Sequence, residues 1–291
     1  MSSSAVLLDV DALRRERARW AVLDASWVYP RLAAPGVDVR AAYRRAHLPG
    51  SLFLDLEALM DPADRLDPAV PSLAPPSAAT LWAALGGAGI GRAQPIVVTD
   101  MEGGTATAPL ARWALLDAGF GEVRLLDGGT PAWREAGFDL VEDAPTMVAG
   151  PRRPAGGGGR SGGRDGRFVT TAETARAVFG EAPDLVVDAR FVASNAGILP
   201  ERYAEMVLPT GAVLRPGEVL EDRGLGQRFR PAAAIRELAT ARGIGPGPVI
   251  VTCHFGVGAA VVATALELAG YGDVRVDRFS LLGWARAQAA G

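Results

Sequence analysis

The chain offers one thiol for chemistry, Cys253, which lies in the stretch VIVTCHFGVGAA at residues 249–260. An ionised cysteine is a good nucleophile, whereas a free cysteine that ends a core strand is often only a small buried hydrophobe. His254 could favour the thiolate or transfer a proton near neutral pH, or it could simply face solvent. One cysteine cannot form an internal disulfide, and with two histidines it cannot build a common clustered metal site. We therefore expect no metal-dependent chemistry.

The residues after Cys253 are suited to hold a negative charge. Gly256 and Gly258 precede an alanine-rich run, so we expect a tight turn into a helix that begins near Gly258. Main-chain N–H groups at such a helix start point into one small volume, and the helix adds about half a positive charge there. Both glycines could adopt the positive φ that a tight turn needs. We expect the thiol to ionise more readily than a free cysteine.

Short strands and longer helices alternate along the chain and would position this turn. Runs such as WAVLD (20–24) and PIVVTD (95–100) predict strands, and ATLWAALGGAG (79–89) and PLARWALLDAG (109–119) predict helices. This alternation predicts an α/β fold with mostly parallel sheets flanked by helices. Ligands of such sheets bind beyond the carboxyl ends of the strands, where Cys253 follows one strand and Asp100 follows another.

The sequence contains an internal repeat, with two similar halves. Identical residues recur at a constant separation of 151 positions, in the pairs Gly119 and Gly270, Val123 and Val274, Arg124 and Arg275, and Trp133 and Trp284. Between the copies lies the Gly-, Pro- and Arg-rich stretch PRRPAGGGGRSGGRDG (151–166), which is typical of a flexible connector. We predict a domain at 1–148, a linker at 149–167 and a domain with Cys253 at 168–291.

Composition limits the classes of partner. A chain of 291 residues with 49% hydrophobic content can bury two cores of ordinary size. A net charge of −3 gives no support for nucleic-acid or membrane-surface binding. The apolar AVLL near the N-terminus is too short for a signal peptide or a membrane span, so we expect a cytoplasmic protein.

The arrangement strand-Cys-x-x-Gly-x-x-Ala-helix, with Cys253, Gly256 and Ala259, resembles the active-site loop of the two-domain rhodanese family. This family contains the thiosulfate and 3-mercaptopyruvate sulfurtransferases. VLDASWVYP (22–30), AHLPGSLFLDLEALMD (46–61) and LDGGTPAWREAGFDL (126–140) resemble the family's non-catalytic first domain, where aspartate typically replaces the cysteine, as Asp100 would here. The resemblance implies two tandem rhodanese-like domains.

The resemblance also implies a reaction. Cys253 would take a sulfane sulfur from a small donor, hold it as a persulfide and pass it to cyanide, a thiol or a carrier protein, without a cofactor. The main chain of the loop would stabilise the negative charge, which makes the following residues candidates for substrate binding: His254, Phe255, Gly256, Val257 and Gly258.

The sequence departs from the family around this site. His254 and Phe255 stand where members carry basic or small polar residues, and Gly258 replaces a hydroxyl residue. Arg190 matches the first of two donor-binding arginines, whereas Ser194 stands at the place of the second, and both are candidates for substrate binding. We interpret three further arginines, any of which could instead reach the pocket, as surface residues: Arg202, Arg215 and Arg278.

Other residues favour structural roles, and other functions stay open. We interpret Trp133 and Trp284 as core residues, His47 as structural, and Asp24 and Asp188 as turn residues. A phosphatase-like loop would need an arginine at its end, and CHFGVGAA has none. Two alternatives to the sulfurtransferase are a specialised cysteine enzyme with a changed reaction and a non-enzymatic module that senses oxidants or binds a partner.

Overall fold

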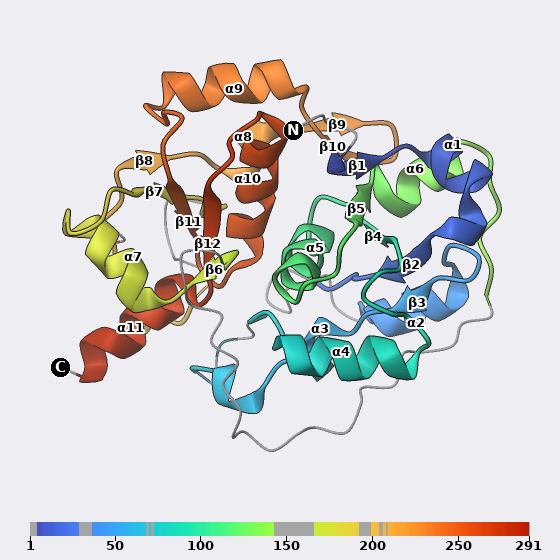
Figure 1. Cartoon of the computed structure of the whole chain (residues 1–291), viewed down its shortest axis with the longest axis horizontal. Helices are drawn as coiled ribbons and strands as arrows, with labels where there is room; N and C mark the ends of the chain where they lie inside the picture. The colour runs from blue at the N-terminus through green and yellow to red at the C-terminus, as the bar shows by residue number, and fades with distance from the viewer. Residues whose placement is uncertain are drawn as a thin grey trace.

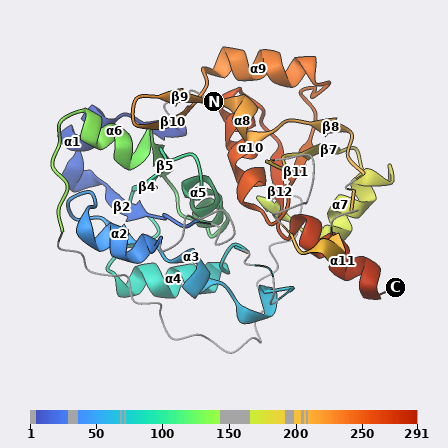
Figure 2. The same ribbon diagram turned by 180° about the vertical axis from the view of Figure 1, so that it is seen from behind.

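The computed structural model describes residues 5–28, 37–67, 70, 73–142, 166–191, 199–203, 206–207 and 209–290. Two five-stranded sheets lie side by side, each covered by helices (Figures 1 and 2). The predicted linker, residues 149–167, falls outside the described residues except for its last two, so the domain boundaries stay a prediction. Among the helices that the structure describes, none is long and apolar enough to span a bilayer.

The first sheet is parallel throughout, with the strand order β1-β5-β4-β2-β3. Its strands are β1 (Leu7–Leu8), β2 (Ala21–Asp24), β3 (Leu52–Phe53), β4 (Ile96–Thr99) and β5 (Val123–Leu126). All four residues of the central strand β4 are buried, as expected for a β-branched run covered on both faces. The helices of this unit are α1 (Val10–Arg15), α2 (Val39–Arg45), α3 (Leu56–Leu59), α4 (Ala78–Gly87), α5 (Ala108–Asp117) and α6 (Gly129–Glu135).

The second sheet repeats the first with the order β6-β12-β11-β7-β8, again all parallel. Its strands are β6 (Phe168–Val169), β7 (Leu185–Asp188), β8 (Ala212–Val213), β11 (Val249–Thr252) and β12 (Val274–Asp277). Its helices are α7 (Thr171–Val178), α8 (Pro216–Val219), α9 (Ala232–Ala241), α10 (Val257–Leu268) and α11 (Ser280–Ala290). The identical order confirms the duplicated α/β fold predicted from the sequence repeat. Trp133 and Trp284 are both buried, as predicted for core residues.

The two units meet through equivalent helices, since α5 and α10 lie side by side between the sheets (Figures 1 and 2). The Trp113 indole N–H donates to the Thr264 hydroxyl at 2.9 Å, and these residues are 151 positions apart. Beside them, the Arg112 guanidinium donates to both carboxylate oxygens of Glu267, at 2.6 and 3.3 Å, with both side chains buried. This interface joins the middle of α5 to the C-terminal half of α10 and so ties the two units together.

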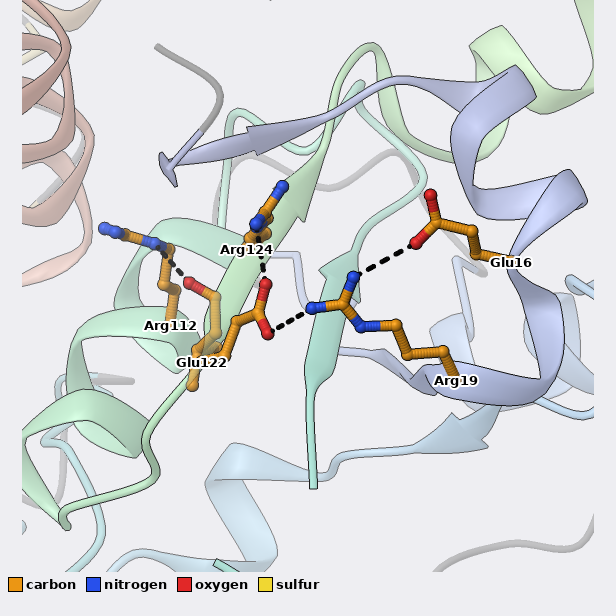
Figure 3. Close-up of polar contacts among 6 residues, drawn as sticks. Glu16, Arg19, Arg112, Glu122 and Arg124 are labelled. Carbon is orange, nitrogen blue, oxygen red and sulfur yellow. Dashed lines mark hydrogen bonds and ion pairs between the residues drawn. The ribbon is translucent and has the colours of Figure 1, made fainter. Parts of the chain in front are cut away.

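A cluster of charged side chains lies at the amino ends of the strands of the first sheet, away from the carboxyl ends where ligands of such sheets bind. Figure 3 shows the Arg19 guanidinium between the carboxylates of Glu16 and Glu122, at 3.2 and 2.8 Å, and Arg124 on the other oxygen of Glu122. Glu122 directly precedes β5 and Arg19 lies just before β2, so the cluster sits at the amino ends of the strands. Because the loops after β4 and β11 lie at the carboxyl ends, we assign this cluster a structural role.

Candidate active site

Cys253 lies between the end of β11 and the start of α10, at the carboxyl edge of the second sheet. The Gly256 N–H donates to Cys253 Sγ at 3.1 Å. The helix begins at Val257, one residue before the predicted start, and Gly256 caps it with φ of 98°. A positive φ of this kind is favourable only for glycine. We refer to residues 253–256 as the cysteine loop.

The ionisation of Cys253 differs from the prediction. Burial raises the pKa of the thiol above its ordinary value, although main-chain hydrogen bonds from Ala259, Phe255 and Gly256 and the hydroxyl of Ser280 act to lower it. One main-chain N–H, that of Gly256, bonds to the sulfur, but burial outweighs the groups that lower the thiol pKa, so the expectation that this thiol ionises more readily than a free cysteine was wrong. The reason is desolvation, because Cys253 is only 2% exposed.

Residues of the first unit cover the cysteine loop. The Phe255 ring meets the Trp27 ring edge-on, with centroids 6.4 Å apart. The Leu73 carbonyl oxygen lies 3.6 Å from the position that a Cβ on Gly256 would occupy. Neither Trp27 nor Leu73 stands out in the sequence, because each lies far from Cys253 along the chain. The cysteine loop therefore faces the junction between the two units rather than open solvent.

Ser280 is a site residue that the sequence reasoning missed. Its hydroxyl accepts the Cys253 main-chain N–H at 3.1 Å and lies 3.8 Å from Cys253 Sγ. Ser280 has φ of 49°, and it is the one non-glycine residue with positive φ among those that the structure describes. Its counterpart 151 positions earlier is Gly129, with φ of 56°. The repeat thus carried the signal: where the first copy has the favourable glycine, the copy with the cysteine has a hydroxyl residue.

A buried carboxyl group supports Ser280. Asp277 is fully buried, and it accepts the Ser280 N–H at 3.1 Å and the Thr252 hydroxyl at 3.1 Å. Burial raises the pKa of Asp277 to about 6, against the effect of these hydrogen bonds. Asp277 thus links the end of β12 to the end of β11 and holds Ser280 against Cys253.

His254 fits neither alternative predicted from the sequence, which were a side chain that assists ionisation or proton transfer at Cys253 and a side chain that faces solvent. Its side chain does not face solvent, since the residue is 1% exposed. Burial, together with the positive charge of Arg190, lowers the pKa of His254 to about 4, so it is neutral near pH 7 and is poorly suited to transfer protons there. Its Nε2 atom is buried without a hydrogen-bond partner. A buried polar atom of this kind is costly unless a ligand satisfies it.

The turn after β7 packs against the end of β11 and the first turn of α10, on either side of the cysteine loop. Asp188 Oδ1 accepts the Arg190 N–H at 2.9 Å, which confirms the predicted turn role. The Arg190 side chain also binds the Asp188 carboxylate, with Nη2 to Oδ2 at 2.7 Å. A Cβ on Gly258 would lie 2.7 Å from the Ala189 carbonyl oxygen, so this glycine permits close packing. Gly258 lies inside α10 without positive φ, and the predicted backbone role was wrong for it.

The remaining candidate residues from the sequence are either placed by the structure or lie outside the part that it describes. Val257 is buried as the first residue of α10. Ser194 lies outside the described residues, as does the side chain of Arg202. Arg278 is not a surface arginine as predicted: its Nη2 donates to Asp64 Oδ2 at 2.8 Å and to a carbonyl oxygen at 2.7 Å, both in the first unit. Arg278 therefore ties the segment after β12 to the first unit.

The first unit holds a carboxylate where the second holds a thiol. Asp100 follows β4 and accepts main-chain N–H groups from four residues, at 2.8 to 3.1 Å: Glu102, Gly104, Ala106 and Ala108. The hairpin of β9 (Leu220–Arg223) and β10 (Gly226–Phe229) reaches over this loop from the second unit (Figure 1). A Cβ on Gly103 would lie 2.1 Å from the Gln227 carbonyl oxygen, so the hairpin closes the Asp100 loop.

Comparisons with known proteins agree with this arrangement. The sequence profile of the rhodanese-like domain matches residues 24–136. SseB of Mycobacterium tuberculosis, which carries the name of a thiosulfate sulfurtransferase, is 33% identical over 259 residues, covering 86% of this chain and 82% of SseB. Human 3-mercaptopyruvate sulfurtransferase is 29% identical, covering 94% of this chain and 88% of the human protein.

Solved structures show the same fold. The crystal structure of SseA from Escherichia coli superposes with a TM-score of 0.73 at 22% identity, covering 94% of this chain and 98% of SseA. A structure of EanB that holds ergothioneine and a persulfide gives 0.76 at 16% identity, covering 99% of this chain and 70% of EanB. The chain belongs to the rhodanese family.

Proposed function

We propose that this chain is a sulfurtransferase in which Cys253 carries a sulfane sulfur from a small donor to a thiophilic acceptor. The candidate donors are thiosulfate, mercaptopyruvate and persulfides, and the candidate acceptors are cyanide, thiols and carrier proteins. The relatives named as sulfurtransferases support this assignment for the whole chain. The observation that carries it is the hydrogen bond from the Gly256 N–H to Cys253 Sγ at the start of α10, with the Ser280 hydroxyl 3.8 Å from the same sulfur.

The chemistry requires two steps. The Cys253 thiolate attacks the sulfane sulfur of the donor, the donor's bond to that sulfur breaks, and the leaving group takes the electron pair. Cys253 then holds the sulfur as a persulfide, whose terminal sulfur is attacked by the acceptor while the Cys253 thiolate leaves. In both states the sulfur carries negative charge, and main-chain N–H groups at the start of α10 are suited to stabilise it. Ser280 can add a hydroxyl donor at this position.

Mass spectrometry of the intact protein tests the proposal. After incubation with thiosulfate, mercaptopyruvate or cysteine persulfide, we expect a mass increase of one sulfur atom. The increase should be absent in Cys253→Ser and should be lost on addition of cyanide or a thiol. If none of these donors loads Cys253 while the protein remains folded, the sulfurtransferase assignment fails. A specialised cysteine enzyme or an oxidant-sensing module would then be the better assignment.

A further inference from the structure

Two segments from opposite units meet at Gly256 of the cysteine loop. The Leu73 carbonyl oxygen of the first unit and the Arg278 carbonyl oxygen of the second each lie 3.6 Å from the position that a Cβ on Gly256 would occupy. Leu73 and the two residues that follow it are buried. We refer to residues 73–75 as the cover segment. The cover segment lies against the cysteine loop and therefore contributes to the burial of Cys253.

The side chain of Arg278 binds the cover segment from the second unit. Its Nη2 atom donates to the Pro75 carbonyl oxygen at 2.7 Å and to Asp64 Oδ2 at 2.8 Å. Pro75 lies only two residues beyond Leu73, the residue in contact with the loop. The Arg278 and Asp64 side chains are 14% and 23% exposed, so salt screens this charge-assisted pair less than it screens a surface pair. One guanidinium therefore binds the cover segment and a second point of the first unit.

The internal repeat provides a matched contact in the first unit. The residue 151 positions before Arg278 is Asp127, whose carboxylate lies 3.6 Å from Arg228 Nη1 on the hairpin of the second unit. Each unit thus contacts the other from the same place in the repeat, directly after β5 or β12, with the charges reversed. The loop next to Asp127 carries Asp100 in place of a thiol. Arg228 is therefore an arginine that joins the two units without touching the cysteine loop's cover segment.

We propose that Arg278 is a positioning residue that holds the cover segment on the cysteine loop and so limits the access of water and reagents to Cys253. The inference rests on the proposed sulfurtransferase function, because it concerns how a donor reaches the nucleophile. Arg278 acts through Leu73 and Gly256 rather than through its charge, and the two roles have opposite signs. Loss of a nearby positive charge raises a thiol pKa, whereas loss of the cover lowers it, since burial is the largest influence that raises the pKa of Cys253.

Alkylation of Cys253, the single cysteine of the chain, tests the inference on the full-length protein. In Arg278→Met we expect the thiol pKa, measured from the pH profile of the iodoacetamide reaction, to fall and the rate at neutral pH to rise about tenfold. The rate with the bulkier N-phenylmaleimide should rise more than the rate with iodoacetamide, because the cover obstructs a large reagent more. Arg278→Lys keeps a nitrogen that can donate to both oxygens, so it should restore part of the slow rate. Arg228→Met, the matched control, should leave both rates unchanged.

Asp64→Asn gives a second arm, because it weakens the same contact from the first unit and leaves the second unit unaltered. Its alkylation rate should rise less than that of Arg278→Met, and the double variant should react no faster than Arg278→Met alone. A raised thiol pKa or an unchanged alkylation rate in folded Arg278→Met would overturn the inference, and if that variant does not fold, Asp64→Asn decides by the same two outcomes.

The alkylation test is separate from the test of the proposed function. Alkylation needs no sulfur donor, so a failed prediction for Arg278 would leave the sulfurtransferase function intact. Failure of every donor to load Cys253 would overturn that function and leave the measured effect of Arg278 on the burial of the thiol unchanged.

Discussion

Replacing Asp277 with asparagine should change how stability depends on pH. In the folded protein, burial raises the pKa of Asp277 from an ordinary value of 3.8 to about 6. Below the lower value the carboxyl group is protonated in both the folded and the unfolded state. Between the two values it is protonated only in the folded state, so each rise of one pH unit lowers the free energy of unfolding by about 1.4 kcal/mol. Above the folded pKa the loss is complete.

The size of the effect follows from this shift. A separation of roughly 2 pKa units corresponds to about 3 kcal/mol of stability lost between acid and neutral pH. Asparagine has nearly the same shape, and its carbonyl oxygen can still accept the Ser280 N–H while its amide faces the Thr252 hydroxyl, which can turn to accept. Asp277→Asn should therefore gain about 3 kcal/mol relative to the unaltered protein as the pH rises from about 4 to about 7.

Urea unfolding at a series of pH values measures this difference. Burial also raises the pKa of Asp24 to about 6, so both proteins should retain some pH dependence, and only the difference between them reports Asp277. Equal dependence of unfolding free energy on [urea] in the two proteins is required for the comparison. Parallel stability curves from about pH 4 to about pH 7 would show that Asp277 ionises in the fold like an ordinary carboxyl group, and the reasoning would be wrong.

Two further predictions concern the cysteine loop and the interface. Ser280→Gly should be more stable than Ser280→Ala by about 1 kcal/mol, because only glycine is favourable at positive φ, and equal unfolding midpoints would contradict this. Both variants lose the hydroxyl group, so both should raise the thiol pKa measured from the pH profile of Cys253 alkylation. Glu267→Gln should cost about 3–5 kcal/mol in urea unfolding, since it leaves Arg112 charged and buried. The double variant with Arg112→Met should recover part of that loss, and strictly additive losses would argue against coupling.

The sequence repeat was sufficient to predict the fold. A constant separation of 151 residues required two copies of one strand order, and the structure has that order in both sheets. Gly256 was also predictable, because a strand that turns at once into a helix needs positive φ there. These features are local, or they repeat along the chain, so they can be read without knowing how distant segments meet.

The environment of the cysteine could not be predicted in the same way. Cys253 and His254 are buried because the first unit brings Trp27 and Leu73 over the loop. No local pattern encodes that contact, so the sequence suggested an ionised thiol and a solvent-facing or proton-transferring histidine. Arg278 was interpreted as a surface residue for the same reason, since its partners lie in the other copy. Interactions between the two units decided the electrostatics of the site.

The contacts of Trp27 and Leu73 with the cysteine loop couple the solvent exposure of Cys253 to the ionisation of its thiol. Burial is the influence that raises the thiol pKa, whereas the main-chain N–H groups and the Ser280 hydroxyl lower it. Any movement that lifts Trp27 or Leu73 from the loop admits water and removes the first influence, but it leaves the donors in place because they belong to the strand end and helix of the second unit. A Cys253 thiol that water reaches should therefore ionise more readily than the buried one, because the same donors then act without the opposing effect of burial.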